Sequence, residues 1–273
     1  MLSHKVRIIG GILLHVTLNQ VSKSFSKENN KPLNVFHDIQ LSIQEGEFIA
    51  LLGPSGCGKS TLLSMIAGLD QPSSGTVLID QKPVQGPGND KSMVFQEPAL
   101  FPWLTVIDNI MFPLRKGMNK KERLQVAQHY LQMVHLSKFS DHYPHELSGG
   151  MQQRVAIARA LAMDTKLLLM DEPFGALDEQ TRLILQDELE NIWLQTHKTI
   201  IFVTHSIRES IRLSDRIILM GARPRSIIAD FNIDLPRPRL QKDMAAIEEE
   251  ILGLLKAEIN QVMKEELEHV HND

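Results

Sequence analysis

The chain has little cysteine, no long apolar run and no large excess of one charge, and each absence excludes a class of protein. Its single cysteine, Cys57, excludes an internal disulfide framework and favours a reducing cytosol. None of its apolar runs reaches about 18 residues, so the chain is not expected to span a bilayer by itself. A net charge of −4 gives no support to nucleic-acid binding through bulk electrostatics.

The beginning of the chain weakly resembles a secretion signal. Residues 8–14 (IIGGILL) are apolar and follow Lys5 and Arg7. The apolar run is too short, however, and no small-residue cleavage pattern follows it. A leader or a misassigned start codon is the better interpretation, and secretion is not expected.

The chain does contain an alternation of apolar strands and helical stretches. Residues 13–21 (LLHVTLNQV) and 39–43 alternate as half-buried strands do, with a polar loop at residues 26–33 between them. Continuous apolar runs, typical of strands buried on both faces of a parallel sheet, occur at residues 48–52, 167–170, 199–204 and 216–220. Helical stretches, such as residues 151–163 and 179–195, separate them. The pattern predicts an α/β fold with a parallel central sheet and a small antiparallel β-subdomain.

Two regions depart from this alternation. Residues 98–146 carry helical patterns at 106–111 and 120–134 and no convincing buried strand, which predicts a mostly helical insert. After residue 235 the sheet pattern ends, and an amphipathic helix is expected. Its apolar stripe consists of Met244, Ile247, Ile251, Leu254, Leu255, Ile259 and Val262. We therefore expect a main domain over residues 15–235, with a helical subdomain at about residues 98–163, and a C-terminal helical tail over residues 236–273.

Residues 53–60 (GPSGCGKS) match the phosphate-binding P-loop pattern GxxxxGK[ST] in full. The segment follows an apolar run and opens a helix at residues 61–67, which Gly68 is expected to end. Glycines let backbone N–H groups close around phosphate oxygens, and the helix N-terminus adds a favourable dipole. Lys59 should reach the β- and γ-phosphates, and the Ser60 hydroxyl should ligate Mg²⁺. The expected nucleotide-binding residues are Gly53, Pro54, Ser55, Gly56, Cys57, Gly58, Lys59, Ser60 and Thr61.

A glycine-rich turn that binds nothing is the alternative. From average composition, a chance match is expected in about one chain in a hundred of this length, and the flanking strand and helix make chance rarer still. The motif by itself predicts binding of ATP or GTP. Cys57 occupies a variable position of the pattern and is assigned no chemistry.

An apolar strand that ends in two acids follows at residues 167–172 (LLLMDE). Such a strand places its carboxylates at the C-terminal edge of the sheet, beside the phosphates. Asp171 is then the expected Mg²⁺ partner, and Glu172 is expected to orient and polarise the attacking water. An acidic turn at a strand end is the alternative, and it would be preferred if no P-loop stood upstream.

Residues 147–152 (LSGGMQ) open a further helix, and Ser148 lies 89 residues after Lys59. Ser-Gly-Gly at a helix start is another potential anion site. The chain thus carries two phosphate-binding helix ends, although one nucleotide has a single γ-phosphate.

Together these motifs resemble the ATP-binding cassette (ABC) family over about residues 16–235. Residues 94–98 (VFQEP) look like the family's Q-loop, residues 175–178 (GALD) like its D-loop, and residues 203–205 (VTH) like its switch histidine. The resemblance implies an α/β P-loop NTPase (RecA-like) core with an antiparallel β-subdomain and a helical subdomain. Residues 147–152 (LSGGMQ) look like the family's signature motif. The resemblance also implies that two copies pair head to tail, so that the signature of one copy closes on ATP held by the other.

The resemblance assigns a role to each further motif residue. Ser148, Gly149 and Gly150 are implied to contact the γ-phosphate of the partner's nucleotide, and Asp178 to couple the two sites. Met151 departs from the family's commonest form, which has Gln there, but the Ser-Gly-Gly core is intact.

Three further residues complete the implied site. Gln96 is implied to contact Mg²⁺ and the attacking water, His205 to contact the γ-phosphate, and Phe25 to stack on adenine. Taken singly, Gln96 would be a surface side chain, His205 a capping or core histidine, and Phe25 a packing residue.

By resemblance, the chain is the ATP-hydrolysing subunit of a bacterial importer, with ATP and Mg²⁺ as cofactors and a location on the cytoplasmic face of the cell membrane. Residues 98–106 (PALFPWLTV) resemble the groove in which family members receive a cytoplasmic helix of the permease; packing within the helical insert is the alternative. The implied partners are a second copy of the chain, transmembrane permease subunits and, indirectly, an extracytoplasmic solute-binding protein, with no nucleic acid.

Other functions stay open. Soluble ABC proteins act in DNA repair or translation, but repair members carry a long coiled coil between P-loop and signature, and translation members usually carry two cassettes. An exporter ATPase with a separate permease is a further alternative. Residues 95–103, 171–178 and 235–239 (LPRPR) resemble the nitrate, sulfonate and taurine importer group, which includes importers of thiamine-precursor pyrimidines. The transported solute is left open, and the tail helix is expected to pack on the domain or to contact a partner.

Overall fold

The computed structural model describes residues 14–25, 33–115, 117–222 and 227–270, with side chains as far as residue 260. The weak signal-like run at residues 8–14 and the loop predicted at residues 26–33 lie almost wholly outside these residues. The chain forms two compact units. The first unit takes residues 1–87 and 201–273, and the second takes residues 88–200.

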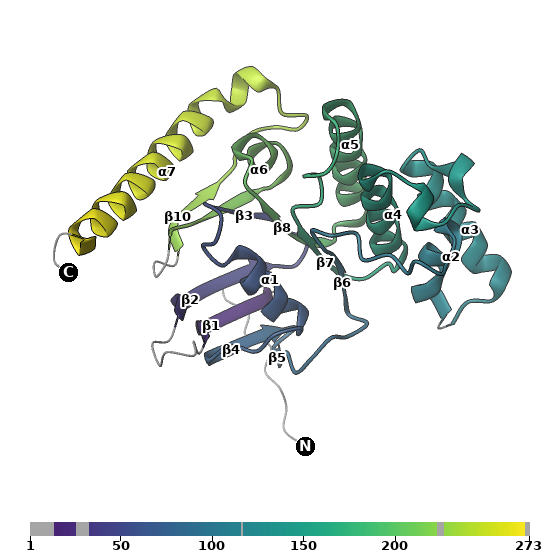
Figure 1. Ribbon diagram of the computed structural model, residues 1–273, viewed down its shortest axis with the longest axis horizontal. Coiled ribbons are helices and arrows are strands. Elements are labelled where there is room, and N and C mark those ends of the chain that lie inside the picture. The colour runs from purple at the N-terminus through teal and green to yellow at the C-terminus, as the bar shows by residue number, and fades with distance from the viewer. Residues whose placement is uncertain (1–13, 26–32, 116, 223–226, 271–273) are drawn as a thin grey trace. The chain divides into compact units, whose positions relative to one another are not determined.

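An antiparallel sheet opens the first unit (Figure 1). Its strand order is β2 (Leu33–Gln44), β1 (Leu14–Phe25), β4 (Ser74–Ile79) and β5 (Lys82–Pro83). One face of β2 is buried and the other exposed, because apolar and polar residues alternate along most of it. The antiparallel β-subdomain expected from the sequence is therefore confirmed.

The first unit also holds the strands that lead to the P-loop, in the order β10 (Ile227–Asn232), β9 (Arg216–Met220), β3 (Phe48–Leu52) and β8 (Thr199–Thr204). The first two residues of β8 belong to the second unit. β3 and β9 pair in parallel, and every residue of β3 and β8 is buried, as the continuous apolar runs predict. β10 was not predicted, because this edge strand is half-exposed and its sequence IIADFN does not alternate.

Three helices accompany these strands: α1 (Lys59–Ala67), α6 (Ile207–Leu213) and α7 (Gln241–Val270), the long yellow helix of Figure 1. Gly68 ends α1 with φ 77°, as predicted. α7 packs against α6.

The apolar stripe expected on α7 is only partly right. Met244 and Ile251 are buried, but Leu254 and Ile259 are exposed. Glu258 is buried instead, because its carboxylate accepts a hydrogen bond of 3.0 Å from the backbone N–H of Ala222. The side chain of Val262, the last predicted member, lies outside the described residues.

The LPRPR segment caps the end of α6. The Arg239 guanidinium donates to the carbonyl oxygens of Ile211 and Ser214, at 2.5 Å each, and to that of Ile233 at 3.1 Å. Arg237 donates to the Leu213 carbonyl at 2.8 Å. The last carbonyls of a helix have no intrahelical partner and carry partial negative charge, so two cations here stabilise the end of α6.

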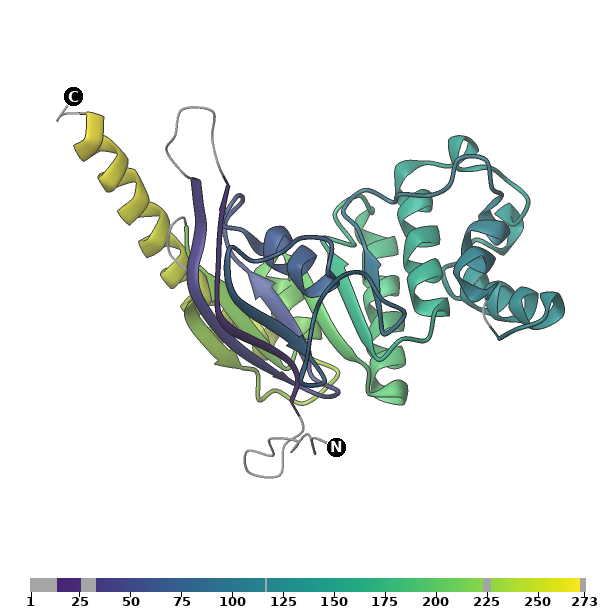
Figure 2. The ribbon, with the colours of Figure 1, turned by 90° about the horizontal axis from the view of Figure 1, so that it is seen from below.

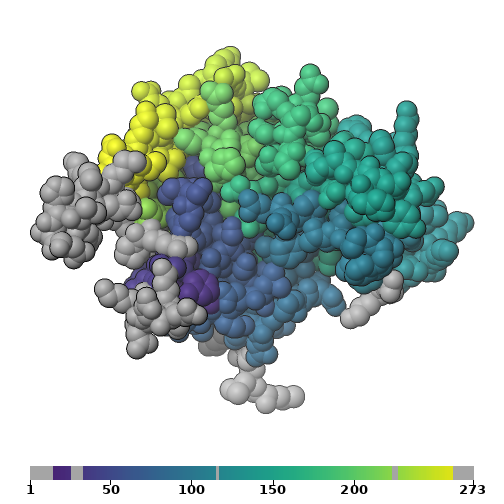
Figure 3. All heavy atoms as spheres, viewed as in Figure 1, coloured from purple at the N-terminus to yellow at the C-terminus, as the bar shows by residue number. Residues whose placement is uncertain are grey.

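The second unit combines two parallel strands, β6 (Lys91–Val94) and β7 (Leu167–Asp171), with most of the helices. α2 (Val106–Met111), α3 (Lys120–Met133) and α4 (Gly149–Ala162) pack on one another. They are teal to green in the ribbon of Figure 2, and Figure 3 draws the atoms of this part of the chain in the same colours. α5 (Glu179–Thr196) follows β7. Short 3₁₀ helices lie at Phe112–Arg115, Ser137–Phe139 and Pro144–Glu146.

Candidate functional site

The P-loop follows β3 and needs glycine at two positions where a side chain would clash. A Cβ at Gly53 would lie 2.5 Å from the Met220 carbonyl oxygen. Gly58 has φ 104°, and a Cβ there would lie 2.7 Å from Val35 Cγ1. The loop therefore lies directly on the strands beneath it, and α1 begins at the residue after Gly58.

Lys59 is 6% exposed and turns back over the loop. Its Nζ donates to the carbonyl oxygens of Gly53 and Pro54 at 2.8 Å each. A buried ammonium must be compensated by hydrogen bonds, and here all of these come from the loop itself. The positive charge is thus held against the backbone of the loop.

The start of α1 is electropositive. Ser60 is exposed and Thr61 half-exposed, and the first turn carries no acidic residue that would offset the helix dipole. Ser55 and Gly56 are also exposed in the loop before it. This arrangement fits an anion and leaves a hydroxyl at the surface.

Cys57 lies within the same loop but is buried. Burial raises the pKa of its thiol above the ordinary value, and this outweighs the opposing effect of Lys59, whose Nζ lies 3.7 Å from the sulfur. A neutral, buried thiol packs rather than reacts, in agreement with the absence of any assigned chemistry.

His205 follows β8 in the first unit and is exposed, so it is not a core histidine. The N-cap of α6 is the next residue, Ser206, whose hydroxyl accepts from the Glu209 N–H at 3.3 Å. Phe25 ends β1 and is 43% exposed, with the Lys23 ammonium 4.8 Å from its ring centroid. Its stacking on adenine stays a prediction.

In the second unit, β7 ends in the two acids expected from the sequence. Asp171 is buried, and Glu172 is half-buried with φ 45°. A left-handed conformation is costly for a residue other than glycine, by about 1–3 kcal/mol, and such strain concentrates at functional sites. Eight other non-glycine residues among those described also have positive φ, so this conformation alone assigns no role, and the role expected for Glu172 stays a prediction.

Gln96 lies just after β6 and is exposed, in a segment that runs into the aromatic residues 101–103. From the sequence, a nucleotide role is expected for Gln96 and a permease groove is expected at residues 98–106. The hydrogen bonds between side chains of α4 and the backbone of this segment were not predicted. Every residue has a carbonyl oxygen, and no sequence pattern marks the one that is bound.

The signature segment, residues 147–152, forms the start of α4. Ser148 and Gly149 are exposed, residues 150–152 are half-buried, and Leu147 is buried. Ser148 is the N-cap, and its hydroxyl accepts from the Met151 N–H at 3.3 Å. No heavy atom lies within 4 Å of a Cβ built on Gly149, whereas one on Gly150 would lie 3.2 Å from the Ala176 carbonyl oxygen. Glycine thus leaves open space on the outer side and permits close approach to the D-loop on the other.

Asp178 has a local role that the sequence did not reveal: it caps α5, and its carboxylate accepts from the Thr181 N–H at 3.0 Å. This hydrogen bond holds the pKa of Asp178 below its ordinary value. A role in coupling two sites stays a prediction.

The predicted site residues fall into two sets. The first unit holds Phe25, residues 53–61 and His205, and the second holds Gln96, residues 148–150, Asp171, Glu172 and Asp178. Among the described residues, no three His, Cys, Asp or Glu side chains gather as a metal site. Mg²⁺ commonly needs only one or two protein carboxylates beside substrate phosphates. The hydroxyl of Ser60 in the first unit and the carboxylate of Asp171 in the second are each of a type that binds Mg²⁺.

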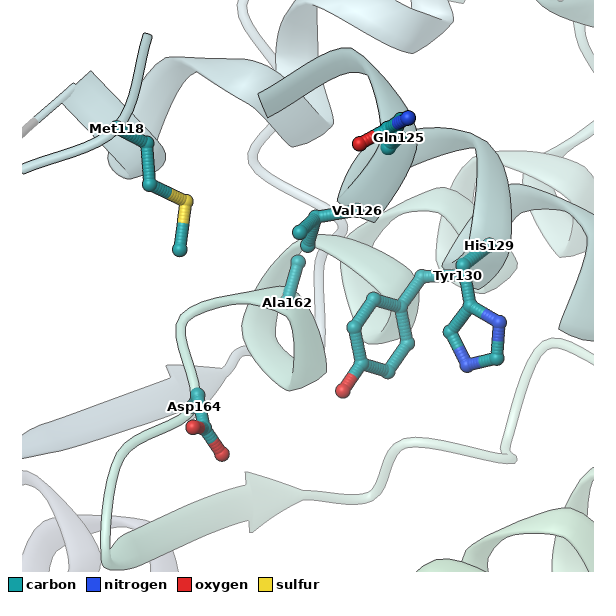
Figure 4. A pocket seen from close by; sticks show the side chains of 7 residues that line it. All are labelled: Met118, Gln125, Val126, His129, Tyr130, Ala162 and Asp164. Carbon is teal, nitrogen blue, oxygen red and sulfur yellow. The ribbon is translucent and has the colours of Figure 1, made fainter. Parts of the chain in front are cut away.

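A cavity of about 440 Å³ in the second unit contains none of these residues (Figure 4). It lies where Tyr130 of α3 approaches Ala162 and Asp164 at the end of α4. Burial, reinforced by the negative charge of Asp164, raises the pKa of Tyr130.

No helix in the described ranges is long and apolar enough to cross a membrane.

Comparison with known proteins agrees with the motifs. The family model described as ABC transporter matches residues 36–175. An uncharacterised ABC transporter ATP-binding protein of Methanocaldococcus jannaschii, MJ0412, is 49% identical over 90% of this chain and 93% of its own length. The nitrate import ATP-binding protein NrtD of Synechocystis is 45% identical over 82% of this chain and 84% of its own.

Two further similarities extend this result. The aliphatic sulfonates import ATP-binding protein SsuB of Bacillus cereus is 47% identical over 82% of this chain and 88% of its own. The solved dimer of the ATP-binding cassette MJ0796, in a post-hydrolysis state with ADP and Pi, superposes with a TM-score of 0.75 at 35% identity and covers 81% of this chain and 100% of its own. The chain therefore belongs to the ABC transporter family, as one of its ATP-binding proteins.

Proposed function

We propose that this ABC ATPase is the ATP-hydrolysing subunit of a bacterial importer and drives uptake of a small solute through separate permease subunits. The observation that carries the proposal is Trp103, which is 69% exposed on a loop of fixed geometry. A large aromatic side chain held at the surface is characteristic of an interaction site.

Asn109 of α2 holds this loop. It is fully buried, and its amide oxygen accepts from the Phe101 N–H at 2.8 Å while its amide nitrogen donates to the carbonyl oxygens of Phe101 and Leu104 at 3.1 Å each. The Phe101 ring contacts Trp103 and Phe112, with ring centroids 5.5 and 4.5 Å apart. We call Phe101, Trp103 and Phe112 the aromatic cluster. We propose that it is the surface that binds a cytoplasmic helix of the permease.

The local geometry of each unit supports the following nucleotide roles. Lys59 and the first N–H groups of α1 would bind the phosphates, and Glu172 would orient and polarise the attacking water. Gln96 and His205 would contact the water and the γ-phosphate, and Phe25 would stack on adenine. Mg²⁺, when bound, neutralises charge on the phosphates, and Ser60, Asp171 and Gln96 would hold it.

The working unit is a head-to-tail dimer in this proposal. Ser148 and Gly149 are exposed at the start of α4 and Gly150 is half-buried, while the P-loop belongs to the other unit of the chain. The solved MJ0796 cassette is dimeric, which supports pairing of two copies, and the head-to-tail arrangement is part of the proposal. Asp178, beside this helix start, would then couple the two nucleotide sites.

Substrate, location and domain bounds complete the proposal. NrtD and SsuB are named for nitrate and aliphatic sulfonates, which supports import of a sulfonate, taurine, nitrate or a similar small solute. The chain would lie at the cytoplasmic face of the membrane and receive solute indirectly from an extracytoplasmic binding protein. Residues 15–235 would form the ATPase domain, with its helical subdomain at about 98–163, and residues 236–273 the tail.

Co-purification tests the permease assignment. The chain with Trp103→Ser should lose a two-subunit permease in detergent while its ATP affinity stays unchanged. Leu194→Ser is the matched control, because Leu194 is an exposed apolar residue of α5 in the same unit. Equal retention of the permease by both variants would overturn the role of the aromatic cluster.

The same preparation separates the alternative functions. Recovery with DNA or ribosomes, and not with a permease, would favour a soluble ABC protein of repair or translation. Outward rather than inward transport by the reconstituted complex would indicate an exporter.

A further inference from the structure

The helix that begins at the signature also holds the backbone on both sides of Gln96. Gln153 of α4 donates through Nε2 to the carbonyl oxygen of Phe95 at 3.1 Å, just before Gln96. Arg159 of the same helix donates to the carbonyl oxygens of Ala99 and Pro98, at 2.9 and 3.0 Å. Side chains of one rigid element therefore contact both ends of the segment that carries Gln96.

Arg159 suits this task because its guanidinium is a planar fork with several donors. Two of its nitrogens reach successive carbonyls, and its Cζ lies 6.0 Å from the centroid of the Phe101 ring. Ala99 has φ 47°, a conformation that alanine rarely adopts, so the segment is held in a geometry it would not take alone. Arg159 thus connects α4 both to the Gln96 segment and to the aromatic cluster.

Gln153 carries a second, independent observation. The side chain is 1% exposed, and its Oε1 is buried without a hydrogen-bond partner among the described residues. A buried oxygen without a partner destabilises a fold, and an apolar side chain of similar size would avoid that cost. A glutamine at this position is therefore better explained by what its Nε2 does to Phe95 than by stability.

The positions of Gln153 and Arg159 along α4 connect the Gln96 segment to the signature at the start of that helix. Gln153 and Arg159 follow Ser148 by 5 and 11 residues, and at 1.5 Å per residue the outer contact lies about 16 Å along the helix from its start. A helix of this length moves as one body. A displacement of the aromatic cluster and the Gln96 segment would then reach the signature through α4.

We propose that Gln153 and Arg159 are positioning residues that fix Gln96 relative to the signature helix and transmit permease contact to it. This inference rests on the proposed function of Gln96 and of the aromatic cluster. Neither residue touches nucleotide in this role. Both act through backbone carbonyls of residues 95–99.

Gln153→Met is the decisive variant, because it removes the donor to Phe95 and the unpartnered oxygen together. We expect its thermal midpoint to be equal to or higher than that of the wild type, and its ATP affinity to be unchanged. We expect kcat to fall by about tenfold or more, since small misplacements of positioning groups slow catalysis strongly. Amide hydrogen exchange in residues 95–101 should become faster.

Arg159→Lys and Lys198→Met are the comparisons. Arg159→Lys keeps the charge and loses the planar fork, so permease stimulation of ATP hydrolysis should be reduced. Arg159→Met loses both the charge and the fork, so this stimulation should disappear. Lys198→Met is the control for lost stability: its buried Nζ contacts Asp164 at 2.6 Å and the Thr165 carbonyl at 2.9 Å, far in sequence from residues 95–99. It should lower the midpoint and leave kcat per folded molecule unchanged.

The outcomes separate this inference from the function on which it rests. If the wild type hydrolyses ATP and responds to the permease but Gln153→Met has unchanged kcat and exchange, the positioning role is wrong. If kcat falls only in proportion to a lowered midpoint, Gln153 is structural and the role is again wrong. If the wild type itself neither hydrolyses ATP nor binds a permease, the proposed function fails first.

Discussion

Two buried cations of the first unit show how the same chemistry serves a ligand site and a fold. Lys59 is 6% exposed and donates to carbonyls of its own loop, five and six residues away. Arg239 is 8% exposed and donates to carbonyls on α6 and before the tail, up to 28 residues away. Both satisfy the rule that a buried charge needs acceptors, but only Arg239 joins distant parts of the chain.

The difference decides what each residue contributes. A lysine is a point charge on a flexible stem, so it can exchange a loop carbonyl for a phosphate oxygen. The arginine fork binds several carbonyls in fixed directions and has nothing to exchange. We therefore expect Lys59 to affect activity and Arg239 to affect stability, and the variants of these two residues described below test that division.

The largest effect is expected at the strained acid of the second unit. Glu172→Gln should leave ATP binding intact and slow hydrolysis at least about a hundredfold, because the group that polarises the attacking water is lost. Binding is measured by nucleotide fluorescence and hydrolysis by phosphate release. Near-normal turnover in this variant would show that Glu172 is only part of an acidic turn at the strand end and has no catalytic role.

Lys59 gives the next effect and tests the dimer. Lys59→Ala alone should lower hydrolysis about a hundredfold, as expected when one electrostatic stabiliser is removed. Mixed with Ser148→Arg, it should restore at most one working site per dimer, because the two defects then share one composite site. Full activity in the mixture would argue against sites shared between subunits.

Arg239→Met should alter stability instead. Removing this cation leaves carbonyls of α6 without partners, and we expect the free energy of unfolding to fall by about 3 kcal/mol, as when a buried charged network is broken. Urea unfolding measures the change, and kcat per folded molecule should stay within about twofold. Arg208→Ala is the control, since its ion pair with Glu248 is exposed and should contribute less than about 1 kcal/mol.

Local patterns in the sequence predict one part of this molecule and miss another. The bounds of β3, β8 and β9 follow from apolar runs that are buried almost throughout, and the P-loop is a contiguous motif. A strand buried on both faces appears as one continuous apolar run, and the P-loop appears as one continuous motif, so each can be recognised from a single stretch of sequence. The elements that were missed are those defined by a partner elsewhere.

The tail shows this limit. An ideal stripe predicts that Leu254 and Ile259 face inward, yet Glu258 is buried instead. Its carboxylate accepts a hydrogen bond from the N–H of Ala222, which lies 36 residues earlier in the chain and which the local pattern does not include. Asn109 and Gln153 likewise act on backbone carbonyls, which every residue has. No pattern of side chains marks which carbonyl will be bound, so these positions become visible only in the fold.

Cys57 gives the smallest expected effect and refines the account of Lys59. Burial raises the pKa of the thiol, so the folded state disfavours the thiolate. Alkylation by iodoacetamide at pH 8 should therefore be slow in the folded chain and fast in urea. The nearby ammonium opposes burial, and Lys59→Ala should slow alkylation of the folded chain further. Faster alkylation in that variant would mean that the lysine shields the thiol more than it polarises it, and that the P-loop opens when its own cation is removed.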